Sequence, residues 1–327
     1  MSREAKARAR SNIALAKYWG KSDRELNLPA VPSISMSLAE FTTETRVIPD
    51  AKLKEDMVIL NDQVAGERER ARVVQLLDQL RSQGETGLRV RVESANNFPT
   101  AAGLASSASG FAALAAAGAA AFELPCDEAE LSRIARRASA SAARSIFGGF
   151  VELPAGKQGD DALAAVAIAS AEYWPLKMVV AVVAEGAKAV GSTEGMERSR
   201  KTSPFYSAWL EAAPQLTSTI RRALLARDLD RLGEAMEQST FAFHCCAISA
   251  SPALFYWRPE TLAVINALRS WREKTGISAY MTMDAGPHVK VLCRAEDSAA
   301  VMEALTQVPG VLRTLLTSCG PGIEVWT

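Results

Sequence analysis

Residues 96–110 read Asn-Asn-Phe-Pro-Thr-Ala-Ala-Gly-Leu-Ala-Ser-Ser-Ala-Ser-Gly, and an alanine-rich segment continues from them to Phe122. Small side chains and glycines let a ligand approach the backbone, and a helix that begins near Ser107 directs free N–H groups and a positive dipole end toward an anion. The stretch therefore predicts a phosphate-binding loop that opens a buried helix. No Gly-Lys-Ser/Thr follows it, so it is not a Walker loop. A plain turn into a tightly packed core helix fits the same residues.

The segments on either side of this loop predict an α+β chain of two domains. A strand over 88–92 leads into the loop, and Asp127 followed by Glu130 predicts a capped helix start. The apolar run over 174–184 predicts a strand buried on both faces. We expect a boundary near 185–188, which gives domains over 1–187 and 188–327. Further elements are predicted as follows: strands over 33–38 and 42–48, a polar turn over 191–196, a helix over 259–275, strands over 277–283 and 289–293, a helix over 296–307, and a final strand of the second domain over 323–326.

The composition indicates a globular enzyme that acts on small molecules. Of the 327 residues 48% are hydrophobic and 23% charged, and Lys plus Arg equals Asp plus Glu at 37 each. Such a balance provides no field that favours nucleic acid or a membrane surface, so an anionic ligand has to be held by a local cluster. The five cysteines contain no Cys-x-x-Cys, and the N-terminus lacks the apolar region of a signal peptide. We therefore expect reduced thiols and a cytoplasmic location.

A group of polar residues follows a short predicted strand over 12–16. Lys17, Tyr18 and Lys21 supply two ammonium groups and a phenol beside a glycine, which suits contact with a phosphate or carboxylate. A core strand that ends in solvated lysines, with Tyr18 packed, fits the same residues.

Two further positions carry candidate chemistry. Arg144 lies among small residues before a double glycine, where a guanidinium either grips a carboxylate or phosphate or pairs with an internal acid. Asp284 ends a predicted strand, where a carboxylate serves as general base or charge partner, or only caps the turn formed by the following Gly-Pro. His244 with Cys245 and Cys246 is interpreted as packed core, because adjacent residues converge poorly on one metal ion.

Taken together, four segments resemble the GHMP kinase superfamily and, more narrowly, the diphosphomevalonate decarboxylase family. They are residues 12–21 (Asn-Ile-Ala through Lys-Tyr-Trp-Gly-Lys), 97–107, 144–152 and 284–287 (Asp-Ala-Gly-Pro). The resemblance implies a two-domain GHMP kinase fold. Its N-terminal α/β domain carries a phosphate loop of the left-handed-crossover type, and its C-terminal α+β domain is ferredoxin-like.

The resemblance also implies a reaction. Mevalonate diphosphate is phosphorylated by ATP with Mg²⁺ on its tertiary hydroxyl, and phosphate and carbon dioxide then leave to give isopentenyl diphosphate. Asp284 would orient or deprotonate the hydroxyl, and Lys17 would keep that carboxylate ionised. A simple kinase of the superfamily, a decarboxylase of mevalonate monophosphate and a non-catalytic nucleotide-binding module are the rival interpretations. A homodimer is expected.

Binding residues follow from the resemblance position by position. The substrate's carboxylate or diphosphate is assigned to Arg144, helped by Tyr18, Lys21, Ser139, Ser141 and Ser192. The ATP phosphates are assigned to Ala102, Gly103, Leu104, Ala105, Ser106, Ser107 and Ser109, with Ser107 near magnesium and with Ser94 and Asn97 near the nucleoside. This chain departs from the family pattern at His288 and over residues 28–33, and we expect both places to border the substrate.

Overall fold

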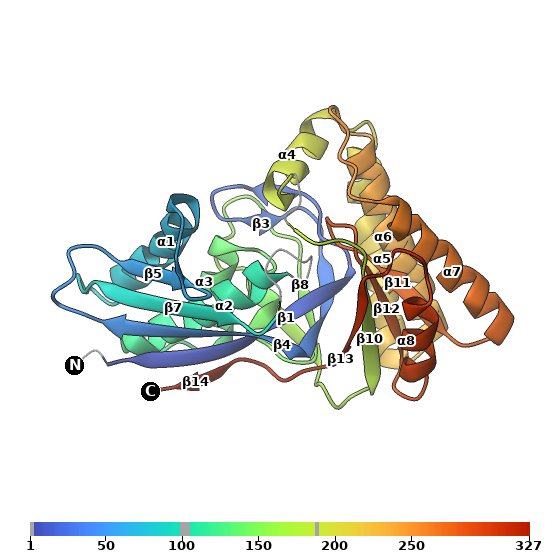
Figure 1. The fold of residues 1–327 in the computed structure, drawn as a ribbon. Coiled ribbons are helices and arrows are strands. Elements are labelled where there is room, and N and C mark those ends of the chain that lie inside the picture. Colours follow the sequence, from blue (N-terminus) through green and yellow to red (C-terminus); the bar gives the residue numbers. More distant parts are fainter. Residues whose placement is uncertain (1–2, 99–104, 187–189) are drawn as a thin grey trace.

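The computed structural model describes residues 3–98, 105–186 and 190–327, and it contains two main sheets, each with its own helices (Figure 1). In the first sheet the strand order is β14-β1-β4-β7-β5-β6, with β8 paired to β4 and β9 to β8. Its strands are β1 (Ala5–Ala16), β4 (Ser33–Pro49), β5 (Met57–Leu60), β6 (Gln63–Val64), β7 (Val90–Asn96), β8 (Phe150–Leu153), β9 (Val166–Ala169) and β14 (Glu324–Trp326). A short hairpin of β2 (Lys21–Asp23) and β3 (Leu28–Pro29) follows β1.

The helix predicted after the phosphate loop is confirmed as α2 (Ser106–Ala121), and it is buried nearly all round. Alanine and glycine allow this close packing, since a Cβ at Gly118 would lie 2.6 Å from Cδ1 of Leu80 in α1 (Glu67–Gln83). The neighbouring helix α3 (Glu128–Ala138) begins as predicted, because the Asp127 carboxylate accepts a hydrogen bond from the Glu130 N–H at 2.8 Å. A 3-10 turn, η1 (Ala142–Ser145), follows α3.

The second sheet has the order β11-β12-β10-β13, with every pairing antiparallel. Its strands are β10 (Leu176–Val182), β11 (Ala279–Thr282), β12 (Val289–Arg294) and β13 (Arg313–Ser318), and its helices are α4 (Ser192–Thr202), α5 (Tyr206–Ala226), α6 (Leu229–Ile248), α7 (Pro259–Thr275) and α8 (Ser298–Thr306). Strand β10 is buried on both faces, as predicted. Met178 and Val180 pack toward α5 and α6, whereas Val179 and Ala181 pack toward α7 and α8.

Several predictions made from the sequence are corrected. The two strands expected over 33–38 and 42–48 are one strand, β4, and the polar turn expected over 191–196 contains the first turn of α4. Strand β13 was missed. The final strand was placed in the second domain, but β14 pairs with β1 in the first sheet (Figure 1).

Strand pairing crosses the division predicted between residues 187 and 188. Strand β10 precedes that point but belongs to the second sheet, and β14 follows it but belongs to the first. The division itself stays a prediction. The core is also shared, since Ile13 and Met36 of the first sheet pack in one cluster with Met178 and Ile220.

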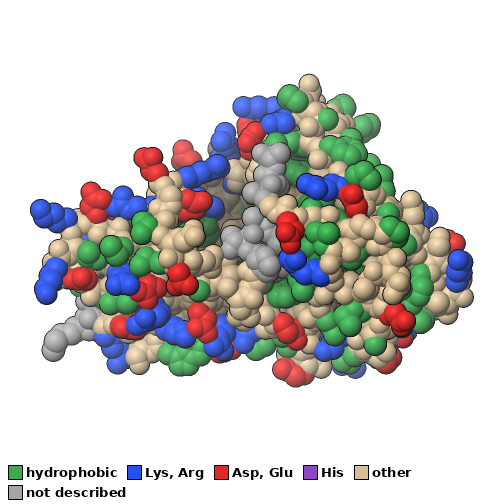
Figure 2. Space-filling view, in the orientation of Figure 1, with side chains coloured by type: hydrophobic (Ala, Val, Ile, Leu, Met, Phe, Trp, Pro, Cys, Tyr) green, Lys and Arg blue, Asp and Glu red, His purple; other side chains and the backbone are tan. Residues whose placement is uncertain are grey.

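Two absences can be stated for the part of the chain that the structure describes. No described helix is both long enough and apolar enough to cross a membrane. On the face shown in Figure 2, acidic and basic side chains are interspersed, so that face carries no extended basic surface. His244 and Cys246 are fully buried, which confirms their interpretation as core residues, whereas Cys245, also on α6, is exposed, so that interpretation is wrong for Cys245.

Candidate functional site

A cavity lies where β1, η1, the β11–β12 turn and the start of α4 meet. It brings together all eight residues predicted for catalysis and substrate binding, which come from segments up to 267 positions apart. These residues are Lys17, Tyr18, Lys21, Ser139, Ser141, Arg144, Ser192 and Asp284.

The polar centre of this cavity is a carboxylate held by two ammonium groups. Lys17 Nζ donates to Asp284 Oδ1 at 2.9 Å and to the Ala14 carbonyl at 2.9 Å. Lys290 Nζ lies 3.2 Å from Asp284 Oδ2. The Lys17 side chain is 3% exposed and that of Lys290 0%, whereas Asp284 is 30% exposed toward the cavity. Both oxygens of the carboxylate are therefore fixed in orientation.

Burial and charge shift the pKa values of this group in defined directions. Burial lowers the pKa of Lys17 to about 8, although the Asp284 carboxylate partly opposes that change. Burial alone would raise the pKa of Asp284, but the ammonium groups of Lys17 and Lys290 bring it well below its usual range. Asp284 is therefore a carboxylate at neutral pH.

Arg144 is held by neutral partners rather than by an acid. Its Nε donates to Ser35 Oγ at 3.0 Å and its Nη1 to Ser33 Oγ at 2.6 Å, and both serines lie on β4. Its Nη2 lies 3.4 Å from Asn12 Oδ1. Among the described residues no carboxylate forms an ion pair with it, and burial lowers its pKa to about 10. Its charge is thus available to an anionic ligand, which favours the ligand-binding interpretation over the internal pair.

Other polar groups face the same space. The Tyr18 hydroxyl is buried without a hydrogen-bond partner in the described ranges, and burial raises its pKa. The pKa of Lys21 falls to about 8, mainly through burial. The charged lining residues are Lys17, Lys21, Arg68, Arg72, Arg144, Glu194 and Asp284, and Glu194 is already paired with Arg198. Such an excess of cations suits a polyanionic ligand.

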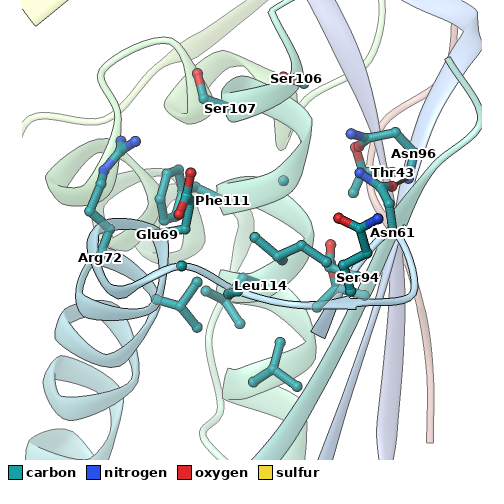
Figure 3. A pocket seen from close by; sticks show the side chains of 18 of the residues that line it. Thr43, Asn61, Glu69, Arg72, Ser94, Asn96, Ser106, Ser107, Phe111 and Leu114 are labelled. Atoms are coloured by element: carbon teal, nitrogen blue, oxygen red, sulfur yellow. Dashed lines mark hydrogen bonds between the residues drawn. The ribbon is translucent and has the colours of Figure 1, made fainter. Parts of the chain in front are cut away.

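A second cavity adjoins the first at the N-terminus of α2. Figure 3 shows Glu69 and Arg72 on one side, Thr43, Asn61, Ser94 and Asn96 on the other, and Ser106 and Ser107 at the helix end. The Arg72 guanidinium lies 4.4 Å from the centre of the Phe111 ring. Arg72 and Ser107 line both cavities, so a ligand in one can reach a ligand in the other at this point.

Only some of the predicted ATP-binding residues line a cavity. Ser94, Ser106 and Ser107 line the second cavity, and Ala105 lines the first. Ala102, Gly103 and Leu104 lie outside the described residues.

Two predicted ATP-binding residues do not line either cavity. The Ser109 hydroxyl is buried 2.6 Å from Thr43 Oγ1, because this position of α2 faces the sheet. The Asn97 amide bonds the backbone of Thr42 and Glu40 instead, and the neighbouring Asn96 lies in the cavity.

The two departures from the family pattern were expected to border the substrate, and this expectation was wrong for His288. Its ring is buried and does not line the cavity, Nδ1 accepts from the Val183 N–H at 3.3 Å, and burial lowers its pKa to about 4. Residues 28–33 do not line the cavity either, although Ser33 acts on it through Arg144.

Sequence reasoning missed several residues of the site. Lys290, Asn12, Ser33 and Ser35 hold the predicted side chains, and Thr43, Asn61, Arg72 and Asn96 line the second cavity. Only Lys290 had a usable signal, because a lysine inside the apolar strand Val-Lys-Val-Leu-Cys is too costly to bury without an acid.

Two family models match this chain. One is the diphosphomevalonate decarboxylase-like N-terminal domain over residues 9–164, and the other is the mevalonate 5-diphosphate decarboxylase C-terminal domain over residues 178–317. The chain is 35% identical to the diphosphomevalonate decarboxylase of Candida albicans, over 95% of its own length and 94% of the relative's.

Solved structures give the same result. The chain is similar, with a TM-score of 0.94 and 35% identity over 100% and 99% of the two chains, to a mevalonate diphosphate decarboxylase from Staphylococcus aureus. A structure described as MDDEF in complex with MVAPP, AMPPCP and magnesium has a TM-score of 0.92 and 40% identity, over 99% of this chain and 98% of that one.

Proposed function

Because this chain belongs to the diphosphomevalonate decarboxylase family, we propose that it converts mevalonate diphosphate and ATP into isopentenyl diphosphate, ADP, phosphate and carbon dioxide. The observation that carries the proposal is the cavity in which the Lys17–Asp284 pair faces Arg144, a buried guanidinium that forms no ion pair with a carboxylate of the described residues. The reaction requires a base for the tertiary hydroxyl of the substrate and a cationic side chain that binds its carboxylate or diphosphate.

Substrate binding is assigned to the cationic side of the cavity. Arg144 donates to the carboxylate or diphosphate of mevalonate diphosphate, and its serine partners on β4 keep the guanidinium plane fixed. The unpartnered Tyr18 hydroxyl and the Lys21 ammonium supply further donors, with Ser139, Ser141 and Ser192 around them. These donors replace the hydrogen bonds to water that a polyanion gives up when it binds here.

Chemistry is assigned to Asp284 and Lys17. Asp284 accepts a hydrogen bond from the tertiary hydroxyl and takes its proton as the oxygen attacks the γ-phosphorus of ATP. The new phosphate ester then leaves as phosphate, while the electron pair of the bond to the carboxylate carbon forms the alkene and carbon dioxide departs. Lys17 offsets negative charge on the transferred phosphoryl group. The leaving phosphate takes the electrons, so no electron-sink cofactor is needed.

ATP is assigned to the second cavity. Free N–H groups at the start of α2 and the hydroxyls of Ser106 and Ser107 face the phosphates, and Ser94 lies on the nucleoside side. Mg²⁺ fits this cavity as a hard ion that takes oxygen ligands. Ser107 would hold it through its hydroxyl, and phosphate oxygens and water would complete its ligands, since the described residues hold no cluster of three or more His, Cys, Asp or Glu side chains. The ion neutralises phosphate charge when bound.

Two further expectations from the sequence remain part of the proposal. A cytoplasmic location agrees with the five free cysteines. A homodimer is expected, and sedimentation velocity of the purified protein tests it directly.

The reaction is tested by incubating the protein with ATP, Mg²⁺ and, separately, mevalonate diphosphate, mevalonate monophosphate and mevalonate. Equal release of ADP and carbon dioxide with the diphosphate alone is the expected result. ADP without carbon dioxide would identify a kinase. Release of both products from the monophosphate would identify mevalonate monophosphate as the substrate instead. No ADP from any of the three would overturn the proposal.

A further inference from the structure

The buried centre of the site contains one ammonium group more than charge balance requires. Lys17 alone neutralises Asp284, yet Lys290 also points at this carboxylate from β12 and is completely buried. A buried ion costs several kcal/mol in lost hydration, and only good pairing offsets that cost. A second lysine that served stability alone would be better replaced by an apolar side chain.

The two lysines differ in their access to ligand. Lys17 and Asp284 line the substrate cavity, whereas Lys290 does not. In the sheet, Lys290 is flanked by Val180 of β10 and Thr282 of β11, which close it off on both sides. Lys290 can therefore act on the reaction only through Asp284.

We propose that Lys290 is a positioning residue that holds Asp284 Oδ2, so that Lys17 can leave Oδ1 and pair with the phosphoryl group of the bound ligand. The carboxylate then remains paired throughout, in the orientation that the hydroxyl of the substrate requires. Because Lys290 continues to pair with Asp284, the positive charge of Lys17 becomes available to the reacting phosphoryl group. The inference rests on the proposed function, because it needs an anion that competes with Asp284 for Lys17.

This arrangement has a consequence that can be measured, because Lys290 also repels the charge of Lys17. The groups that face Lys17 are Asp284 on the β11–β12 turn, Lys290 on β12, Arg144 on η1 and His244 on α6. Burial is the main cause of the lowered pKa of Lys17, and the positive charge of Lys290 lowers it further. Removing that charge raises the pH at which Lys17 loses its proton.

The test compares Lys290→Met with the wild-type enzyme in profiles of kcat/KM against pH. We expect kcat to fall by about 10-fold or more while both KM values stay within about 3-fold, because the base is misplaced but the ligand contacts remain. The lowered pKa of Lys17 leads us to expect the basic limb of the wild type near pH 8. In Lys290→Met this limb should move up by roughly one unit, as expected for the loss of a nearby like charge. Lys290→Arg keeps the charge and should leave the limb in place.

Leu292→Ala is the matched control, because Leu292 is two residues further along the same strand, is fully buried and carries no charge. It should lower the melting temperature without moving the limb. Lys290→Met should melt at or above the wild-type temperature, because it removes a surplus buried charge. Lys290→Gln removes the same charge with a polar side chain, and its pH profile provides a second measurement of the limb.

An unmoved limb in Lys290→Met, or an equal shift in Leu292→Ala, overturns the inference. Failure of both Lys290→Met and Lys290→Gln to fold also overturns it, because Lys290 would then be structural. Absence of carbon dioxide from the wild type with mevalonate diphosphate would instead overturn the proposed function, so the two failures are distinguishable.

Discussion

Lys17 holds its charge in a place where an ammonium is poorly solvated, which makes the site sensitive to pH. Its pKa in the folded protein, about 8, is below the ordinary value of 10.5, so the ammonium is lost as pH rises through about 8. Asp284 has the opposite sensitivity and stays ionised to low pH. The alkaline side of the pH profile therefore reports on Lys17.

We predict that kcat/KM falls above about pH 8, because deprotonated Lys17 no longer offsets phosphoryl charge. Lys17→Arg should abolish this limb, since a guanidinium does not titrate in that range. Lys21 has a pKa that is also lowered to about 8, so Lys21→Met is the control. A limb that persists in Lys17→Arg and disappears in Lys21→Met would assign it to Lys21 and contradict the prediction.

We predict that Asp284→Asn lowers kcat by about 10²- to 10⁴-fold, the range typical for loss of a general base. Binding of a non-hydrolysable ATP analogue should be unchanged, because Asp284 does not line the nucleotide cavity. The melting temperature should also fall, since Lys17 and Lys290 remain buried without their counterion.

Glu194→Gln is the control for Asp284→Asn, because Glu194 lines the same cavity but pairs with Arg198. Carbon dioxide release by Asp284→Asn within 10-fold of the wild-type rate would exclude the role assigned to this carboxylate.

At the scale of elements, close helix packing holds the two cavities in shape. The start of α2 is fixed because its small residues let the helix lie against β1 and β4, and Ser109 bonds Thr43 across that contact. In the second domain α6 lies against β11 through Gly233, where a Cβ would overlap the ring of Tyr280. Helix α6 supplies Ser239, whose hydroxyl accepts a hydrogen bond from the Lys17 N–H at 3.0 Å. The packing of α6 therefore also fixes the backbone at Lys17, directly after β1.

We predict that Gly233→Ala lowers the free energy of unfolding by roughly 1–3 kcal/mol, because α6 has to move away from Tyr280 or the ring has to leave its position. Gly110→Ala on α2 is the matched control. Its Cβ would meet open space, so it should be neutral or stabilising by about 0.5–1 kcal/mol. Both are measured by denaturant unfolding, and equal stability of the two variants would contradict this account.

At the scale of the whole molecule, the chain end returns to the chain start. In Figure 1 the strand β14, near the C-terminus, lies beside β1 at the edge of the first sheet, and the two strands pair. Arg10 bonds the Gly322 carbonyl at 2.7 Å and forms an ion pair with Glu324. The Trp326 ring lies under Arg8, whose guanidinium carbon is 5.3 Å from the ring centre. The last strand therefore covers the edge of the strand that leads to Lys17.

We predict that deletion of residues 324–327 lowers the melting temperature and increases self-association, because the edge of β1 becomes available to other chains. Differential scanning calorimetry and light scattering at several concentrations measure both effects. Deletion of Thr327 alone, which lies beyond β14, is the control. An unchanged melting temperature in the longer deletion would show that β14 is dispensable.

The sequence by itself determined several elements and the family of this protein. The alanine-rich run located α2, helical periodicity located α7, and a continuous apolar run located the doubly buried β10, because each of these signals lies in neighbouring residues. The two-domain α+β fold and the decarboxylase family followed from four short segments, and the comparisons confirm both. The meeting of Lys17, Arg144 and Asp284 in one cavity was expected on the same basis.

Only the tertiary structure decided which distant segments meet. It placed β10 in the second sheet and β14 in the first, because strand pairing depends on which apolar faces a partner can cover and not on order along the chain. It turned Asn97 to the backbone and Asn96 into the cavity, a choice set by which neighbour satisfies the amide. It also brought Lys290 to Asp284, because a buried ammonium is costly unless it is paired, and folding decides which acid lies within reach.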